Sequence, residues 1–253
     1  MTNSKAQVIA FANQKGGVAK TTTTLNLAAA FVEKGHRTLC VDLDPQGNLT
    51  MSQGIDPDQL EVSMYDVLVH GTSIREVIKR REVDVAPASI DLAGAEIAMS
   101  TMIGRERALE KAFKPILEDY DYIFIDTPPS LGLLTINALA ASDRVIIPQQ
   151  CEFLATRGLT LLLKTLEKVR ARLNRNLRVE GILPTMFDGR TTHANEVLGE
   201  LRTAFPGQVF DVVIKESVRV KESPAAGLSI FDYDAGHDVA RAYERLAKEV
   251  DHA

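Results

Sequence analysis

The sequence contains no tryptophan, and its 253 residues include only two cysteines, Cys40 and Cys151. These two lie far apart inside apolar runs and lack the close spacing of metal ligands. The pattern argues against a disulfide-stabilised secreted scaffold and against a structural zinc site. We interpret both cysteines as reduced core residues of a cytoplasmic protein.

Long apolar stretches are also missing. No stretch approaches about 18 uninterrupted apolar residues, and Asn13, Gln14 and Lys15 interrupt the first apolar run, so neither a membrane span nor a signal peptide is predicted. Basic residues do not dominate, because 29 lysines and arginines face 34 acidic residues and the net charge is −5. This balance argues against a uniformly basic protein surface but is compatible with one local basic patch.

The chain lacks internal repeats, low-complexity tracts and Pro/Ser-rich linkers. Its length and its 45% hydrophobic content are enough for one sizeable core. We therefore predict a single domain over residues 1–253. Because only seven residues precede the first predicted strand, we expect no added helix-turn-helix domain at the N-terminus.

Apolar runs and helical periodicities alternate along the chain, which predicts an α/β fold. The predicted strands are Val8–Ala12, Thr38–Leu43, Val83–Pro87, Tyr122–Ile125, Arg144–Pro148, Val179–Pro184 and Val209–Ile214. The predicted helices are Lys20–Lys34, Met64–Val69, Ile74–Lys79, Leu92–Leu117, Leu133–Ala141, Thr156–Leu173, Ala194–Phe205 and Ala235–Val250. The expected architecture is a doubly wound, mainly parallel sheet with helices on both faces.

A glycine loop follows the first predicted strand, at residues 14–22 (QKGGVAKTT). In a P-loop, backbone N–H groups surround phosphates, a lysine neutralises them and a hydroxyl ligates Mg²⁺ at a helix N-terminus. Lys20 and Thr21 have the residue types and positions for the last two roles. A glycine pair between lysines also fits a solvated surface turn, but the order of strand, loop and helix favours the phosphate site.

The loop departs from the usual pattern G-x-x-x-x-G-K-[ST], because Gln14 and Ala19 occupy the outer glycine positions. What remains is K-G-G-x-G-K-T-T with one change, and it carries an extra lysine, Lys15. If position 19 requires a positive φ, the Cβ of Ala19 costs about 1–2 kcal/mol.

Two predicted strands end in carboxylates, where ligands collect in parallel sheets. The second strand leads into VDLDPQGN, with Asp42 and Asp44, and the fourth ends at Asp126 in IDTPPS. Asp44 is placed to orient a water near a terminal phosphate, and Asp126 to hold Mg²⁺ directly or through water. The alternative for Asp42 and Asp44, that they only cap and solvate a turn, stays open.

With these motifs in order, the chain resembles the ParA/MinD family of deviant Walker A ATPases, and specifically the small ParA-type partition ATPases. The resemblance covers nearly the whole chain, including residues 181–191 (GILPTMFDGRT) and 218–224 (VRVKESP). It implies an ATPase with ATP and Mg²⁺ as cofactors and slow intrinsic turnover. The implied phosphate-loop contacts are Lys15, Gly16, Gly17, Val18, Ala19, Lys20, Thr21 and Thr22.

The resemblance also implies roles for single residues. Lys15 is the signature lysine that crosses a dimer interface to the partner's nucleotide, Lys20 contacts phosphates and Asp44 positions water, so these three are the candidate catalytic residues. Thr21 and Asp126 are the candidate metal residues.

At the adenine, the family usually carries a proline and an asparagine near the seventh strand. This chain has Lys215 and Ser217 there. We place both residues beside the nucleotide together with Met186, and we expect base contacts through the backbone at the two changed positions.

Non-specific DNA binding is the next implication. Arg190 and Arg219 coincide with arginines that the family uses for it, and we add Lys221. The stretch Lys168–Arg178 holds five basic residues and no acid, but basic residues at a helix C-terminus also complement its dipole in water. The implied assembly is an ATP-bound homodimer on DNA, stimulated by a ParB-like partner, in the cytoplasm and on the nucleoid.

Four alternatives remain. A MinD-like membrane ATPase needs a C-terminal amphipathic membrane helix, whereas the apolar residues of Ala235–Ala253 suggest a stripe packed on the core. An iron protein of this fold needs cluster cysteines in loops. An ATP-dependent biosynthetic enzyme of this fold would use the P-loop to act on a small-molecule substrate. The change to Ala19 also leaves open a DNA-binding protein with an inactive nucleotide site.

Overall fold

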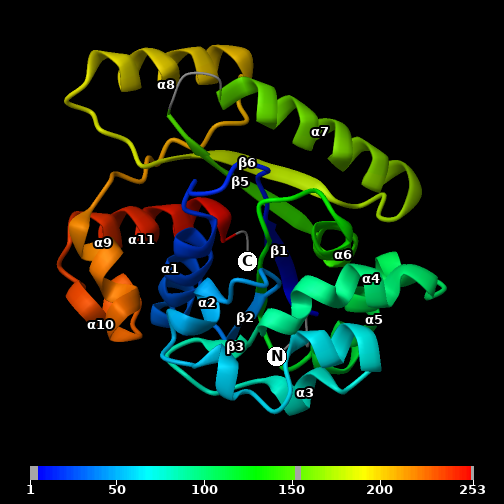
Figure 1. Cartoon of the computed structure of the whole chain (residues 1–253). Helices are drawn as coiled ribbons and strands as arrows, with labels where there is room; N and C mark the ends of the chain where they lie inside the picture. Colours follow the sequence, from blue (N-terminus) through cyan, green and yellow to red (C-terminus); the bar gives the residue numbers. More distant parts are fainter. Residues whose placement is uncertain (1–4, 152–154, 252–253) are drawn as a thin grey trace.

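A six-stranded parallel sheet forms the centre of the protein, with strand order β3-β2-β4-β1-β5-β6 (Figure 1). The computed structural model describes residues 5–151 and 155–251. The strands are β1 (Gln7–Phe11), β2 (Thr38–Asp42), β3 (Asp84–Ala86), β4 (Tyr122–Asp126), β5 (Arg144–Gln150) and β6 (Arg178–Thr185).

Eleven α-helical segments of the described chain surround or flank the sheet. They are α1 (Lys20–Glu33), α2 (Asn48–Met51), α3 (Ile74–Val77), α4 (Ala95–Ala98), α5 (Ala108–Phe113), α6 (Leu133–Ala141), α7 (Ala155–Arg172), α8 (Thr192–Ala204), α9 (Val218–Glu222), α10 (Ile230–Asp234) and α11 (Asp238–Val250). Short 3-10 turns and one π-helical segment, Asp66–His70, complete the connections.

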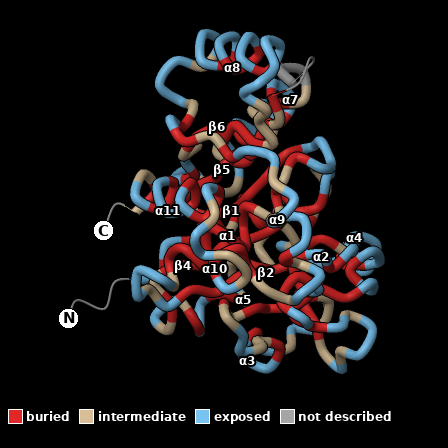
Figure 2. Tube along the Cα trace, turned by 90° about the vertical axis from the view of Figure 1, so that its left-hand side faces the viewer, coloured by how far each residue is buried: buried red, intermediate tan, exposed pale blue. Residues whose placement is uncertain are grey.

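Both faces of the sheet are covered, as the near-continuous apolar strands predict. Alternate residues of β1 belong to different cores: Ile9 packs with α1 and α11, whereas Ala10 packs with α5, α6 and α7. Figure 2 shows the buried strands enclosed between exposed helical surfaces. The expected doubly wound α/β architecture is confirmed.

The helices that follow β1 and β4 pack on opposite faces of the sheet, although the two strands are neighbours. A topological switch point therefore lies between the carboxyl ends of β1 and β4. In open α/β sheets this is where ligands bind.

The predicted seventh strand, Val209–Ile214, is wrong as a regular strand. The segment runs beside β6 and makes isolated hydrogen bonds, from Phe210 N to Ile182 O (3.0 Å) and from Ile214 N to Pro184 O (2.9 Å). Pro184 has no N–H to continue a ladder, which accounts for the interruption. The segment still delivers residues 215–217 to the carboxyl end of β6.

The predicted long helix Leu92–Leu117 is also wrong. Gly104 has a left-handed φ of 72° and separates α4 from α5, and Pro115 follows α5 in a 3-10 turn. Both residues break helical hydrogen bonding. The predicted helix Met64–Val69 becomes the π-helical segment, and α2, α9 and α10 were not predicted.

The C-terminal helix begins at Asp238 instead of Ala235, because the side chain of His237 caps it by accepting from Val239 N. Its apolar residues are buried, Tyr243 and Leu246 completely. The expected stripe packed on the core is confirmed. No helix among the described residues is long and apolar enough to cross a membrane.

The contact between β6 and the following irregular segment is tight at Gly181. An added Cβ there would lie 2.6 Å from Cε2 of Phe210, which is buried. Gly181→Ala should therefore lower the free energy of unfolding by about 1–3 kcal/mol, because the ring has little space to move. Gly199→Ala is the control, since outside the adjacent residues and backbone of α8 no described atom lies within 4 Å of that Cβ. It should raise stability by about 0.5–1 kcal/mol. Urea unfolding measures both, and equal effects would contradict this packing.

Candidate functional site

The loop between β1 and α1 lies at the switch point, and buried hydrogen bonds of Asn13 fix its start. Asn13 is buried, donates to Pro148 O (2.8 Å) and accepts from Lys15 N (2.9 Å). Gly17 and Ala19 both have left-handed backbones, with φ of 72° and 61°. The anticipated strain at Ala19 is therefore present, because its Cβ crowds the carbonyl in this conformation.

Lys20 begins α1 and is almost completely buried. Its ammonium lies 3.5 Å from the backbone oxygen of Lys15. Burial lowers the pKa of Lys20, while the charges of Asp126 and Asp44 oppose that shift. A buried cation at a helix N-terminus suits a phosphate oxyanion.

Thr21 and Asp126 meet beside this lysine. Thr21 Oγ1 donates to Asp126 Oδ2 (2.5 Å). Asp126 is fully buried, and its Oδ1 has no hydrogen-bond partner among the described residues. Burial raises the pKa of Asp126, and the charge of Asp42 adds to the effect. An unpaired buried carboxylate oxygen next to a hydroxyl is a donor set of hard oxygens, which fits Mg²⁺.

Asp42 and Asp44 have different roles. Asp42 is fully buried and accepts from Asp44 N (3.0 Å), Thr50 N (2.9 Å) and Thr50 Oγ1 (2.7 Å), so it fixes the turn and α2. The turn-capping alternative therefore describes Asp42. Asp44 instead lines the cavity over the loop, and Gln46 N donates to its Oδ1 (3.0 Å).

A cavity of about 670 Å³ lies over the loop and brings together residues from distant parts of the chain. It joins the glycine loop and Asp44 to the ends of β6 and α9. The predicted residues that line it are Gly16, Gly17, Ala19, Lys20, Thr21, Thr22, Asp44, Met186, Lys215, Ser217 and Lys221.

Two predicted loop residues lie outside this lining. The side chain of Val18 is buried in the core, and its carbonyl accepts from Thr185 Oγ1 (3.1 Å), so only its backbone N–H is available for a phosphate. Lys15 does not line the cavity, and its ammonium lies 3.3 Å from Gln150 Oε1 at the end of β5.

Sequence reasoning missed several residues of the lining. Gln46 and Asn48 follow Asp44, and Pro129 follows the Asp126 strand. Their signal was present, because they belong to the quoted motifs. Val220 of α9 and Pro224 just after it also line the cavity, and they lie in the quoted stretch 218–224.

The predicted DNA-binding residues lie in the loop between β6 and α8 and on α9. Arg190 is 89% exposed and pairs with Asp188 (Nε to Oδ1, 2.8 Å). Arg219 and Lys221 are on α9 and pair with Glu222 and Glu216, respectively. Each cation is thus partly neutralised by a neighbouring carboxylate in the single chain.

The basic stretch Lys168–Arg178 ends α7 and forms the following turn. Arg170 Nε donates to Leu177 O (2.8 Å) and so stabilises that turn. Arg170 therefore has a structural role in this turn.

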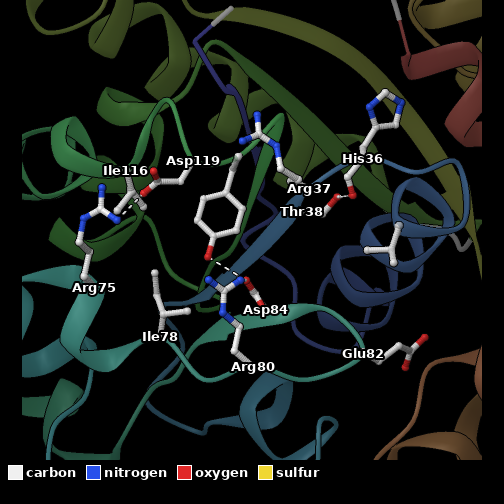
Figure 3. A pocket seen from close by; sticks show the side chains of 12 residues that line it. His36, Arg37, Thr38, Arg75, Ile78, Arg80, Glu82, Asp84, Ile116 and Asp119 are labelled. Carbon is white, nitrogen blue, oxygen red and sulfur yellow. Dashed lines mark hydrogen bonds and ion pairs between the residues drawn. The ribbon is translucent and has the colours of Figure 1, made fainter. Parts of the chain in front are cut away.

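A second cavity, of about 570 Å³, lies near the amino ends of β2 and β3 (Figure 3). Its arginines are paired: Arg75 Nη1 lies 2.6 Å from Asp119 Oδ2, and Arg80 contacts Asp84. Tyr120 also donates to Asp84 (2.8 Å). The positive charge in this cavity is thus neutralised within the chain.

The comparisons with known proteins agree with the geometry. A family model described as an AAA domain matches residues 6–179. Bacillus subtilis Soj, the sporulation initiation inhibitor protein, is 48% identical over 247 residues, which cover 96% of this chain and 98% of Soj. The chromosome partitioning protein ParA of Myxococcus xanthus is 44% identical and matches over 96% of this chain and 87% of its own length.

This chain belongs to the ParA/Soj family of P-loop ATPases. Its fold also matches a solved structure of a Mycobacterium smegmatis protein described as cobyrinic acid a,c-diamide synthase with ADP and magnesium. That match has a TM-score of 0.85 and 42% identity, and it covers 96% of this chain and 93% of the other. The predictions of a ParA-type partitioning ATPase and of its fold class are confirmed.

Among the described residues no group of three or more His, Cys, Asp and Glu side chains could hold a metal, and Cys40 and Cys151 are buried.

Ala19 offers a direct test of the loop conformation in this ParA-family chain. Ala19→Gly relieves about 1–2 kcal/mol of strain and adds about 0.4–1 kcal/mol of unfolded-state freedom. The net result should be a gain in stability of up to about 1.6 kcal/mol. Ala171→Gly, on an exposed part of α7, is the matched control and should lose about 0.5–1 kcal/mol. Thermal unfolding distinguishes the two signs, and a loss of stability in both variants would rule out the strained loop.

Proposed function

We propose that this chain binds ATP and Mg²⁺ in the cavity over the glycine loop and acts as a nucleotide-dependent switch in DNA segregation or cargo positioning. The observation that supports this most is the cavity itself. It unites Lys20 and Thr21 with Met186, Lys215 and Ser217, which lie far away in the sequence. Backbone N–H groups of Gly16 to Thr22 would bind phosphate oxygens. The part of the cavity lined by Met186, Lys215 and Ser217 would hold the base.

Thr21 and Asp126 would hold the metal, and a bound Mg²⁺ would neutralise charge on the phosphates. Lys20 would stabilise the negative charge that moves toward the leaving oxygen. Asp44 would orient the attacking water, because it lines the cavity and is fixed by Gln46 N. Phosphoryl transfer depends mainly on such positioning and charge stabilisation.

Lys15 would act in a second copy of the chain. Its ammonium lies at Gln150, outside the lining of its own cavity. A face-to-face ATP-bound homodimer would let each Lys15 reach the partner's nucleotide, much as an arginine supplied in trans does. None of the described cavity-lining residues is an arginine, so we expect slow intrinsic turnover and stimulation by a ParB-like partner.

The metal site gives the test of nucleotide binding. The wild-type chain should bind a fluorescent ATP analogue in the micromolar range or better with Mg²⁺, and EDTA should weaken binding. Asp126→Asn removes the charge of the unpaired buried carboxylate, so the difference between Mg²⁺ and EDTA should shrink by about tenfold or more. Asp121→Asn, whose partner is Arg37, is the control and should keep the full difference. No binding by the wild-type chain, with or without Mg²⁺, would overturn the proposed function.

DNA binding would use Arg190, Arg219 and Lys221 on phosphate groups, without sequence preference. Their acidic neighbours weaken the field of one chain. Dimerisation would join two such surfaces on one DNA and raise the effective affinity without a new kind of contact. We therefore expect the protein to associate with the nucleoid in its ATP state and to leave it after hydrolysis.

Charge reversal tests this surface. Arg190→Glu and Arg219→Glu should each reduce DNA co-sedimentation by about tenfold at low salt while ATP affinity stays unchanged, and the salt dependence should become shallower. Lys114→Glu carries the same charge change near Ile116 at the second cavity. It should bind DNA like the wild-type chain. Unchanged DNA affinity in both arginine variants would refute the assignment.

A second candidate function is an ATP-dependent enzyme that acts on a metabolite. It is favoured by one observation, the 42% identity to the Mycobacterium smegmatis protein described as cobyrinic acid a,c-diamide synthase. The names of the curated relatives and the exposed Arg190 favour partition instead. ATP turnover that responds to DNA supports partition, and turnover that responds only to a carboxylic acid metabolite supports the enzyme.

A further inference from the structure

Ser217 lies between the nucleotide cavity and a third cavity, of about 510 Å³. On the nucleotide side it lines the same cavity as Met186 and Ile214. On the other side lies His237, whose Nε2 is 3.3 Å from Ser217 Oγ. The two side chains come from different elements, the start of α9 and the start of α11.

The hydrogen bonds of His237 define which nitrogen carries the proton. Val239 N donates to His237 Nδ1 (3.1 Å), so Nδ1 is an acceptor and bears no hydrogen. In the neutral ring the proton is then on Nε2, which donates to Ser217 Oγ. The N-cap of α11 thus fixes the tautomer that faces the serine.

The hydroxyl hydrogen of Ser217 remains to be placed. Ser217 stands at the N-cap position of α9, but its side chain makes no capping hydrogen bond there. Within the described part of the chain its oxygen is paired with His237. An oxygen that accepts a hydrogen bond is polarised and becomes a better donor, so the hydroxyl is prepared to donate into the cavity.

We propose that His237 is a positioning residue for base recognition, which holds Ser217 as a hydrogen-bond donor to an unprotonated ring nitrogen of adenine. This rests on the proposed function, because it requires ATP in the cavity. Adenine offers such acceptors at N1, N3 and N7. The pair thereby supplies a side-chain contact at a position where we expected contact through the backbone alone.

The two nitrogens of His237 can be tested separately. His237→Asn retains an acceptor near Nδ1 and keeps the cap of α11, but it cannot reach Ser217. His237→Gln retains a donor near Nε2 and loses the cap. If His237 only caps α11, the asparagine variant should resemble the wild-type chain. If His237 positions Ser217, the glutamine variant should instead retain the wild-type recognition of the base.

The experiment measures the affinities of ATP, 1-deaza-ATP, 3-deaza-ATP and 7-deaza-ATP by competition with a fluorescent ATP analogue. In the wild-type chain one deaza analogue should bind about 3- to 10-fold more weakly than ATP, the usual value of one hydrogen bond. That penalty should disappear in Ser217→Ala and His237→Asn and persist in His237→Gln. The melting temperature should fall in His237→Gln and stay near the wild-type value in His237→Asn.

The same set of measurements separates the possible failures. Equal deaza penalties in the wild-type, Ser217→Ala and His237→Asn chains overturn the inference and leave ATP binding intact. Loss of the penalty in His237→Gln, with retention in His237→Asn, overturns it in favour of a helix cap alone. Absence of ATP binding in the wild-type chain overturns the proposed function and the inference with it.

Discussion

The structure depends on the parallel register of β1, β4 and β2 at their carboxyl ends. Asp126 is level with Phe11 on one side and with Asp42 on the other. This register puts two buried carboxylates side by side next to a buried ammonium, Lys20, at a helix N-terminus. Desolvation makes such an arrangement costly unless the charges find partners. Asp42 has its partners in Thr50 and the turn, whereas one oxygen of Asp126 has none among the described residues.

The groups near the unpaired oxygen of Asp126 have complementary chemistry. The glycine loop offers N–H groups to an anion, and Asp126 with Thr21 offers oxygens to a cation. A nucleotide with Mg²⁺ brings both charges at once, which would compensate the buried groups. Strain at Ala19 adds to the cost that the ligand-free fold carries at this loop.

The sequence was sufficient for the parts of the fold and site that depend on local chemistry. The glycine loop, the strands that end at Asp42 and Asp126, and the strain at Ala19 could all be predicted, because residue type and neighbours determine them. The predicted strand Val209–Ile214 failed, because the interruption comes from Pro184 of the adjacent strand and not from the segment itself. The predicted helix Leu92–Leu117 failed because Gly104, with its left-handed backbone, and Pro115 interrupt a segment whose apolar residues have helical spacing. The contact of Ser217 with His237 joins two helix starts through tertiary packing and has no local signal.

The α9 segment links the ends of the site. Lys221 lines the nucleotide cavity, Arg219 faces solvent beside Glu222, and Ser217 immediately precedes the helix. A change in this short helix on nucleotide binding would therefore reach the base contact and the proposed DNA surface together. This proximity is a physical route by which one ligand could alter affinity for another.

A crystal structure of this chain with Mg²⁺ and a non-hydrolysable ATP analogue tests the central claim most directly. The account predicts the triphosphate on the loop from Gly16 to Thr21, the metal at Thr21, and Lys15 of a second copy within hydrogen-bonding distance of the phosphates. A phosphate-free loop, or a Lys15 that faces solvent in every assembly, would contradict it.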